Sequence, residues 1–280
     1  MLFRLRMSID DAIAAYIRLV EQVFSEKKTF LQEGIFKATR LEQAIITVIQ
    51  AEGVDPRQVL LRKEDGPKWC ALTFCSYSCI LIENPSFVCA MPSRNMSFPT
   101  LFRSWIPRAN PSYNCTIIQA ARATTAARIF FKAAKFGDPP QRYLDGELRC
   151  NNPVKYVVQE AGSLYPGRQI SCLLTLGTGA GQVIGLDESN ALERVFPTKI
   201  LKVLHAIARD CEQRSQEMAS DLSSLSNSTL YIRLNVDEGL RGLLDEWRRL
   251  GDVTTHTEQY LKKHEVGQRV DQLVQVLKGM

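Results

Sequence analysis

In this 280-residue sequence, the strongest candidate for proton transfer is the carboxylate of Asp145, which is followed by Gly146. Asp-Gly is by itself a common turn pair. Three neighbours distinguish it from an ordinary turn. The apolar pair at 143–144 predicts a short strand leading into it, the sequence NNP at 151–153 predicts a helix start after it, and the small-residue sequence AARATTAA at 120–127 predicts a closely packed helix before it. Asp145 is therefore a candidate functional carboxylate.

A glycine-rich stretch, GTGAG at 177–181, follows a predicted apolar strand and invites comparison with phosphate-binding loops. A nucleoside-triphosphate loop needs Gly-Lys-Ser/Thr, but position 182 is Gln. The dinucleotide fingerprint needs its third glycine one place later than Gly181, and a helix after it. We predict a tight turn, and no nucleotide cofactor.

The eight cysteines do not form a metal-binding framework. Cys70, Cys75 and Cys79 are closest together, no Cys-x-x-Cys pair occurs, and all three histidines lie far downstream. The sequence therefore predicts no metal and no other cofactor. The cysteines are expected to be reduced thiols in a reducing compartment.

The elements that must position Asp145 alternate between strands and helices, which indicates an α/β fold. The apolar segments Phe87–Ala90 and Ile170–Leu176 are expected to lie in one mostly parallel sheet covered by helices. Helices are predicted at 8–27, 38–52, 116–131, 153 onward, 198–219, 240–250 and 254–277, and strands at 69–90, 143–144, 170–176 and 229–236. Ser8 is expected to cap the first helix and Asn114 the helix from 116.

Four motifs in this order resemble those of the patatin-like lipid acyl hydrolases, in particular fungal-type members. They are FVCAMPSRN followed by FRSW (87–105), AARATTAARIFF (120–131), LDGELRCNNPV (144–154) and LLTLGTG (173–179). The tail YIRLNVDEGLRGLLDEW (231–247) is similar to the stretch that closes such domains. The resemblance covers about residues 1–265.

The resemblance implies a three-layer α/β/α sandwich and a phospholipase A or acylglycerol lipase activity on lipid carboxylic esters. It implies a Ser–Asp dyad, in which a serine attacks the ester carbonyl and an aspartate accepts its proton. The matching proton acceptor is Asp145. Gly146, Asn151, Asn152 and Arg122 match the motif residues that support it.

This sequence departs from the family pattern at the nucleophile. None of the 16 glycines belongs to a Gly-x-Ser-x-Gly elbow, and no Gly-Gly-Gly oxyanion loop occurs. In the family both lie before the helix that here starts at Ser8, so we expect a domain truncated at its N-terminus, without its first strands and inactive by itself. Glu147 replaces a small residue of the family motif, and Arg128 replaces a proline.

Residues 71–85 are a second departure, because the family runs directly into the strand at 87. Two interpretations remain open. The segment is an insertion or a mis-spliced piece of the gene, or it is a genuine strand hairpin. We expect one patatin-like domain over residues 1–185, which residues 186–280 complete with one further strand and C-terminal helices.

The net charge of +5 is spread along the chain and predicts no nucleic-acid binding. No apolar run reaches the roughly 18 residues of a membrane span, and the N-terminus does not read as a secretory signal. We expect a cytoplasmic protein with peripheral membrane contact, whose partner is a lipid ester at a membrane surface; downstream domains and protein partners stay unspecified. The alternative is a non-catalytic pseudoenzyme or interaction module.

Overall fold

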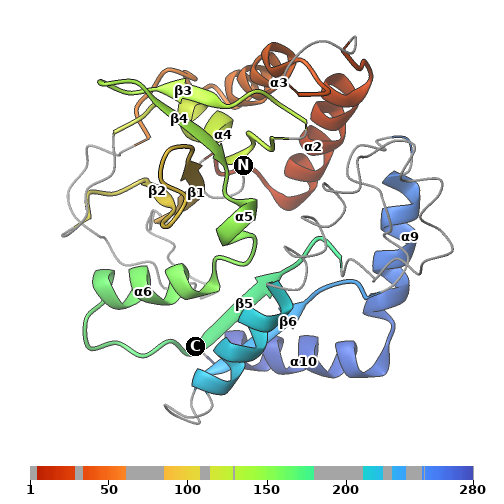
Figure 1. Cartoon of the computed structure of the whole chain (residues 1–280). Helices are drawn as coiled ribbons and strands as arrows, with labels where there is room; N and C mark the ends of the chain where they lie inside the picture. Colours follow the sequence, from red (N-terminus) through yellow and green to blue (C-terminus); the bar gives the residue numbers. More distant parts are fainter. Residues whose placement is uncertain are drawn as a thin grey trace, which may run out of the picture. The chain divides into compact units, whose positions relative to one another are not determined.

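The computed structural model describes residues 5–28, 34–60, 85–107, 114–128, 130–179, 211–222, 229–237, 248 and 250–279. Within these ranges the chain forms two compact units (Figure 1). The first unit ends at Cys150 and the second begins at Asn151. Asp145 belongs to the first.

The first unit contains a four-stranded sheet in the order β2-β1-β4-β3, in which every pairing is antiparallel. Its strands are β1 (Phe87–Pro92), β2 (Thr100–Arg103), β3 (Ala134–Phe136) and β4 (Gln141–Asp145). The connection between β3 and β4 is the four-residue turn 137–140, and residues 93–99 join β1 to β2. Both connections are too short for the crossover that a parallel pair requires.

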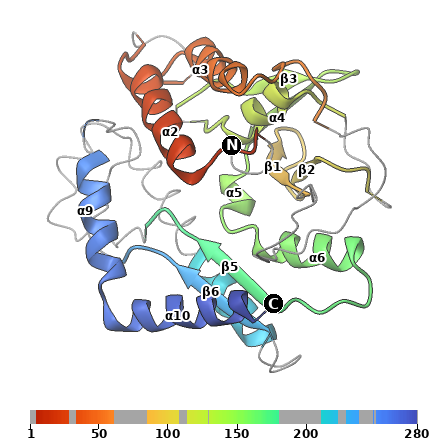
Figure 2. The ribbon, with the colours of Figure 1, turned by 180° about the vertical axis from the view of Figure 1, so that it is seen from behind.

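Helices cover this sheet in succession. The helices of the first unit are α2 (Ile9–Phe24), α3 (Ala38–Ala51), α4 (Ile117–Thr124) and the short α5 (Glu147–Cys150). Helix α4 packs against β1, β3 and β4, α3 packs against α4, and α2 packs against α3 (Figures 1 and 2). The small residues Ala120 and Ala123, both buried, allow α4 to approach the strands closely.

Side-chain caps determine where two of these helices begin. Ser8 caps α2 as predicted, since its Oγ accepts the N–H of Asp11 at 3.1 Å. The cap of α4 is Thr116, not Asn114, and Thr116 forms a reciprocal capping box with Gln119. The predicted cap at Asn114 is therefore wrong, because the paired Thr-x-x-Gln spacing satisfies two backbone N–H groups at once.

Helix α4 is shorter than the predicted helix to Phe131. Its C-cap is Thr125, whose Oγ1 donates to the carbonyl of Ala121 at 2.7 Å. Directly afterwards, the carbonyl of Ala126 accepts the backbone N–H of Asp145 at 3.1 Å. In a helix that continued to Phe131, this carbonyl would accept the N–H of Phe130, which instead donates to the carbonyl of Ala127 at 2.9 Å.

Aromatic side chains form two groups in the core of the first unit. Phe24, Phe36, Phe130 and Phe131 form one group, with the rings of Phe24 and Phe36 4.8 Å apart and nearly perpendicular. A second group on the sheet consists of Phe102, Phe136 and Tyr143. The first group joins the end of α2 to the segment before α3 and to the segment after α4, so it organises the helical layer.

The second unit is built on a parallel pair of strands, β5 (Cys172–Leu176) and β6 (Leu230–Leu234). Its helices are α6 (Val154–Leu164), α9 (Leu250–Leu261), α10 (His264–Lys278) and a helix that includes residues 211–222. The single helix predicted over 254–277 is two helices, because Lys263 adopts an extended conformation (ψ 133°) between them. Helix α10 packs against β6 (Figure 2).

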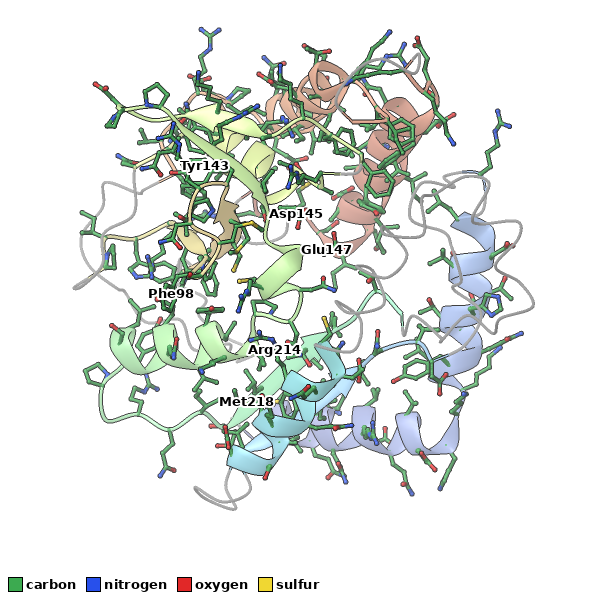
Figure 3. All side chains as sticks on the ribbon, viewed as in Figure 1. Phe98, Tyr143, Asp145, Glu147, Arg214 and Met218 are labelled. Carbon is green, nitrogen blue, oxygen red and sulfur yellow. The ribbon has the colours of Figure 1, made fainter. Side chains whose placement is uncertain are left out.

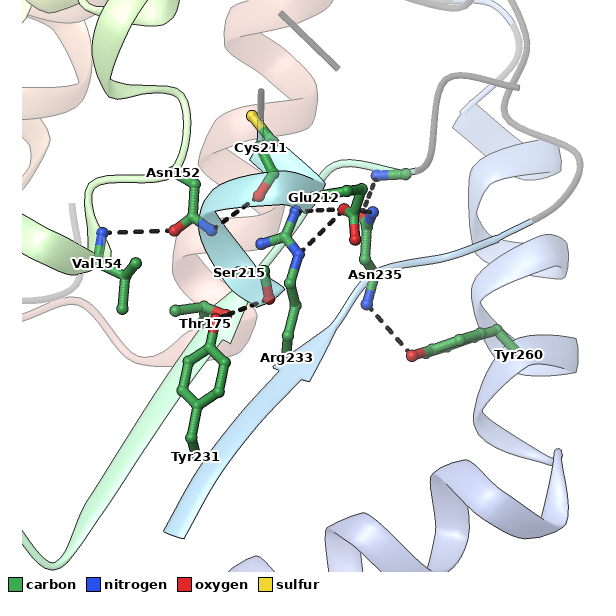
Figure 4. Close-up of polar contacts among 11 residues, drawn as sticks. Asn152, Val154, Thr175, Cys211, Glu212, Ser215, Tyr231, Arg233, Asn235 and Tyr260 are labelled. Carbon is green, nitrogen blue, oxygen red and sulfur yellow. Dashed lines mark hydrogen bonds and ion pairs between the residues drawn. The ribbon is translucent and has the colours of Figure 1, made fainter. Parts of the chain in front are cut away.

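A polar network fastens the ends of β5 and β6 to the neighbouring helices (Figure 4). Glu212 Oε1 accepts hydrogen bonds from Arg233 Nη2 at 2.9 Å and from Asn235 Nδ2 at 3.0 Å. Asn235 Oδ1 in turn accepts the backbone N–H of Gly179 at 2.9 Å. Gly179 has φ 111°, a conformation that favours glycine. The predicted tight turn at 177–181 stays a prediction, because residues 180 and 181 lie outside the described ranges.

The observed strand pairing corrects the predicted sheet. The chain is a mixed α/β protein as expected, but the expectation of one mostly parallel sheet is wrong. Strand β1 has β2 on one edge and β4 on the other, so neither edge is free for β5, which pairs with β6 in a separate sheet. The three-layer sandwich and the missing first strands remain predictions, and the resemblance rests on its sequence motifs rather than on the sheet.

Several predictions fall on residues outside the described ranges. They are the insertion at 71–85 apart from Pro85, the domain boundary at 185–186, the helix at 198–219 up to residue 210, and the helix at 240–250 apart from residues 248 and 250. In the parts of the chain that the structure does describe, no helix combines the length and apolar character needed to cross a membrane.

Candidate functional site

Asp145 is the last residue of β4 and lies directly before α5 (Figure 3). It pairs with Ala90 of β1, which is fully buried. The backbone N–H of Glu147 donates to Asp145 Oδ1 at 2.6 Å and holds the carboxylate over the start of α5. The predicted position of Asp145 at the end of a short strand is confirmed.

Gly146 is required at its position by close backbone contact. A Cβ atom there would lie 2.8 Å from the carbonyl oxygen of Cys89 and 3.2 Å from its carbonyl carbon. Cys89 belongs to β1, so a side chain at 146 would push β4 away from β1 beside Asp145. Gly146 therefore allows β1 and β4 to approach each other next to Asp145, the candidate functional residue.

Gly146→Ala should lower the free energy of unfolding by about 1–3 kcal/mol, the usual cost of forcing a methyl group into a filled site. Gly162→Ala is the matched control, because Gly162 lies inside α6 with no atom near its added Cβ. There alanine should stabilise the helix by up to about 1 kcal/mol. Urea denaturation measures both changes, and a Gly146→Ala variant as stable as the parent would contradict the close contact.

The environment of Asp145 favours its protonated form. The pKa of Asp145 is raised from its ordinary 3.8 to about 7, chiefly by burial and to a smaller extent by the negative charge of Glu147. The hydrogen bond from the Glu147 N–H acts in the opposite direction, because it stabilises the carboxylate. Burial also raises the pKa of Glu147. A carboxyl that titrates near neutral pH is suited to accept and return a proton.

Two buried thiols lie beside this carboxyl. Cys89 on β1 and Cys150 on α5 are both free and buried, and their side chains are hydrogen-bonded to each other. That bond, followed by burial, holds the pKa of Cys89 well above its usual range. Since thiolates are the nucleophiles, the protonated thiol of Cys89 is unsuited to attack an ester.

The other family-motif residues lie in different surroundings. Arg122 is buried in α4, where its Nη2 donates to the carbonyl of Lys132 at 3.2 Å, and burial lowers its pKa. Asn151 is exposed. Asn152 is buried in the second unit, where its Oδ1 accepts the N–H of Val154 and its Nδ2 donates to the carbonyl of Cys211 (Figure 4). Of these motif residues, Gly146 lies beside Asp145. Arg122 and Asn152 instead form hydrogen bonds that hold helices in place.

Ser8, the first serine of the chain, is occupied as a helix cap. Its Oγ accepts the N–H of Asp11 and donates to Asp11 Oδ2 at 2.6 Å. This pattern uses the hydroxyl for capping, as the sequence predicted, and not for a bond to Asp145.

Sequence reasoning missed the thiol pair and the part that Glu147 plays beside Asp145. Cys89 and Cys150 are far apart in the sequence, and no pattern links them. Glu147 was noticed only as a departure from a small residue. Its position two residues from Asp145 was a signal that it would act on the same charge.

No protein-family model matches the chain. Two characterised proteins show partial similarity. Phospholipase A I of Arabidopsis thaliana is 36% identical over 62 residues, which are 22% of this chain and 5% of that protein. Calcium-independent phospholipase A2-gamma of Oryctolagus cuniculus is 28% identical over 149 residues, which are 52% of this chain and 18% of that protein.

Both partly similar proteins are phospholipases A, and this partial similarity favours a lipid acyl hydrolase. The matched stretches span less than a fifth of the length of either relative. The activity of the whole relatives is therefore a proposal for this chain.

Proposed function

We propose that this chain is part of a patatin-like lipid acyl hydrolase in which Asp145 is the proton acceptor of a Ser–Asp dyad. The observation that carries the proposal is the partly buried Asp145 carboxyl at the end of β4, whose pKa of about 7 lets it exchange a proton near neutral pH. The similarity to two phospholipases A supports lipid esters as the substrate class.

In the proposed reaction a serine outside these 280 residues attacks the ester carbonyl. Its proton passes to Asp145, and Asp145 then returns the proton to the oxygen of the leaving alcohol. Water hydrolyses the acyl-serine in the second half of the reaction, again with Asp145 accepting a proton. The substrate lies at a membrane surface, so we propose a cytoplasmic protein that binds membranes peripherally and needs no metal or other cofactor.

The test compares the 280-residue chain with the same chain fused to an upstream patatin-like segment that carries the glycine-rich loop and Gly-x-Ser-x-Gly. The chain alone should release no chromogenic alcohol from an acyl ester above background, and the fusion should be active. Asp145→Ala should reduce kcat of the fusion by roughly 10⁴-fold, as expected for loss of the residue that supports a serine nucleophile. Glu21→Gln, an exposed carboxylate on α2, is the control and should leave kcat unchanged.

Two outcomes would contradict this assignment. If the chain alone hydrolyses the ester and loses that activity in Asp145→Ala, another of its residues is the nucleophile, and Ser8 and Thr124 are the first to replace. If an active fusion is unaffected by Asp145→Ala, Asp145 is not the base. A folded fusion without activity would favour the non-catalytic interaction module.

A further inference from the structure

Two cysteines from distant parts of the sequence meet beside the candidate site. Cys89 lies on β1 and Cys150 is the last residue of α5, and both are free, buried thiols of the first unit. Their side chains are hydrogen-bonded to each other, so the two sulfur atoms are neighbours. The proposed hydrolysis uses neither of them.

The backbone around Gly146 independently brings these two cysteines together. A Cβ atom at Gly146 would lie 3.0 Å from the Cβ of Cys89, so β1 and the start of α5 touch at this point. The carbonyl of Gly146 accepts the backbone N–H of Cys150 at 2.7 Å, which places Cys150 one turn further along the same face of α5. Helix α5 packs against β1. The turn that follows Asp145 (Figure 3) therefore carries Cys150 back to Cys89.

A pair of adjacent thiols can do chemistry that a single buried thiol cannot. In the described ranges, no group of three or more His, Cys, Asp and Glu side chains is arranged to hold a metal ion, so the pair is not part of such a cluster there. Two neighbouring thiols can instead be oxidised to a disulfide, because the second thiol captures the oxidised form of the first.

We propose that Cys89 and Cys150 form a reversible disulfide, with a peroxide as the oxidant and a thiol as the reductant. In the first step the Cys150 sulfur attacks an oxygen of hydrogen peroxide, the O–O bond breaks, and Cys150 becomes a sulfenic acid while one water leaves. In the second step the Cys89 sulfur attacks the Cys150 sulfur, the S–O bond breaks, and a second water leaves. The two thiols lose two electrons and two protons, and the peroxide takes up both.

The hydrogen bond between the thiols gives the two sulfurs different roles. That bond, followed by burial, raises the pKa of Cys89 well above its usual range. Cys89 keeps its proton, so Cys150 is the sulfur that reacts first. Burial of both thiols should make the reaction slower than that of an exposed cysteine. Once formed, the disulfide ties the end of α5 to β1 and fixes the turn that positions Asp145.

The experiment treats the folded 280-residue chain with hydrogen peroxide, blocks the remaining thiols by alkylation and maps disulfides by mass spectrometry of proteolytic peptides. The expected product joins Cys89 to Cys150 and is reversed by dithiothreitol. The oxidised chain should unfold at a higher urea concentration than the reduced chain, because the link closes a long loop in the unfolded state. Oxidation in urea should remove the preference for this pair among the eight cysteines, since the preference depends on the fold. No turnover is needed, so the result does not depend on the proposed function.

Single replacements separate this pair from the other thiols. Cys150→Ala removes the partner and should abolish the crosslink at Cys89. Cys115→Ala, at another buried free thiol of the same unit, should leave the crosslink unchanged. A sulfinic acid at Cys150 without a disulfide, or crosslinks that involve only other cysteines, would overturn the proposal. If Cys150→Ala does not fold, the peptide map of the unmodified sequence decides by itself.

Discussion

Asp145→Asn should stabilise the first unit at pH 8 by on the order of 2–4 kcal/mol and should change its stability little at pH 4. The pKa of Asp145 is raised from 3.8 to about 7 in the folded state, and each pKa unit corresponds to 1.36 kcal/mol. Between pH 4 and 7 the folded protein keeps a proton that the unfolded chain has lost. The free energy of unfolding therefore falls as the pH rises through this range.

The amide variant does not carry this cost, because it cannot ionise. Its Oδ1 can still accept the N–H of Glu147, so the turn into α5 is retained. The measurement is urea denaturation of parent and variant at pH 4 and pH 8, with hydrogen exchange at the β1 and β4 amides to locate the change. Glu21→Gln, which removes an exposed carboxylate from the same unit, should show no comparable gain. Equal stability of Asp145→Asn and parent at pH 8 would show that Asp145 is not destabilised by burial.

A stability gain at Asp145 has a functional meaning. A structural carboxylate is normally paired or hydrogen-bonded so that ionisation stabilises the fold, whereas functional sites often keep groups that reduce stability. A higher free energy of unfolding in Asp145→Asn would therefore indicate that Asp145 is kept for function and not for the stability of the turn. This conclusion does not depend on an activity assay.

Phe36→Ala should lower the free energy of unfolding by about 3–5 kcal/mol, the range for truncating a large buried aromatic side chain. Phe36 is completely buried, and its ring contacts Phe24, Phe130 and Phe131. Its backbone N–H also donates to the carbonyl of Phe130 at 2.8 Å, so little rearrangement is available to fill the cavity. Urea denaturation followed by circular dichroism measures the loss.

Phe98→Ala is the matched control for this substitution. Phe98 lies between β1 and β2 with 75% of its surface exposed, so its removal should cost less than about 0.5 kcal/mol. A similar loss at both positions would contradict the assignment of Phe36 to the core. A loss below 1 kcal/mol at Phe36 would show that its four-ring group does not organise the helical layer.

Local features of this protein were predictable from the sequence. The Ser8 cap, the start of α3 at Ala38 and the arrival of a strand at Asp145 all follow from nearby residues. Caps, helical periodicity and short apolar runs act over a few residues, so no distant partner is needed to read them. The end of α4 was not predictable in this way, because a carbonyl at Ala126 is taken by Asp145.

Tertiary structure alone decided the sheet and the chemistry of the site. The sequence of an apolar strand does not show which strands will pair with its two edges. Strand β1 pairs with β2 and β4, and it runs antiparallel to both. The raised pKa of Asp145 follows from burial, and the paired thiols of Cys89 and Cys150 from packing between distant segments. The sequence by itself determined which carboxylate to examine and that Glu147 stands two residues from it. Only the fold partly buries both side chains, and this loss of solvation raises the pKa of Asp145 to about 7.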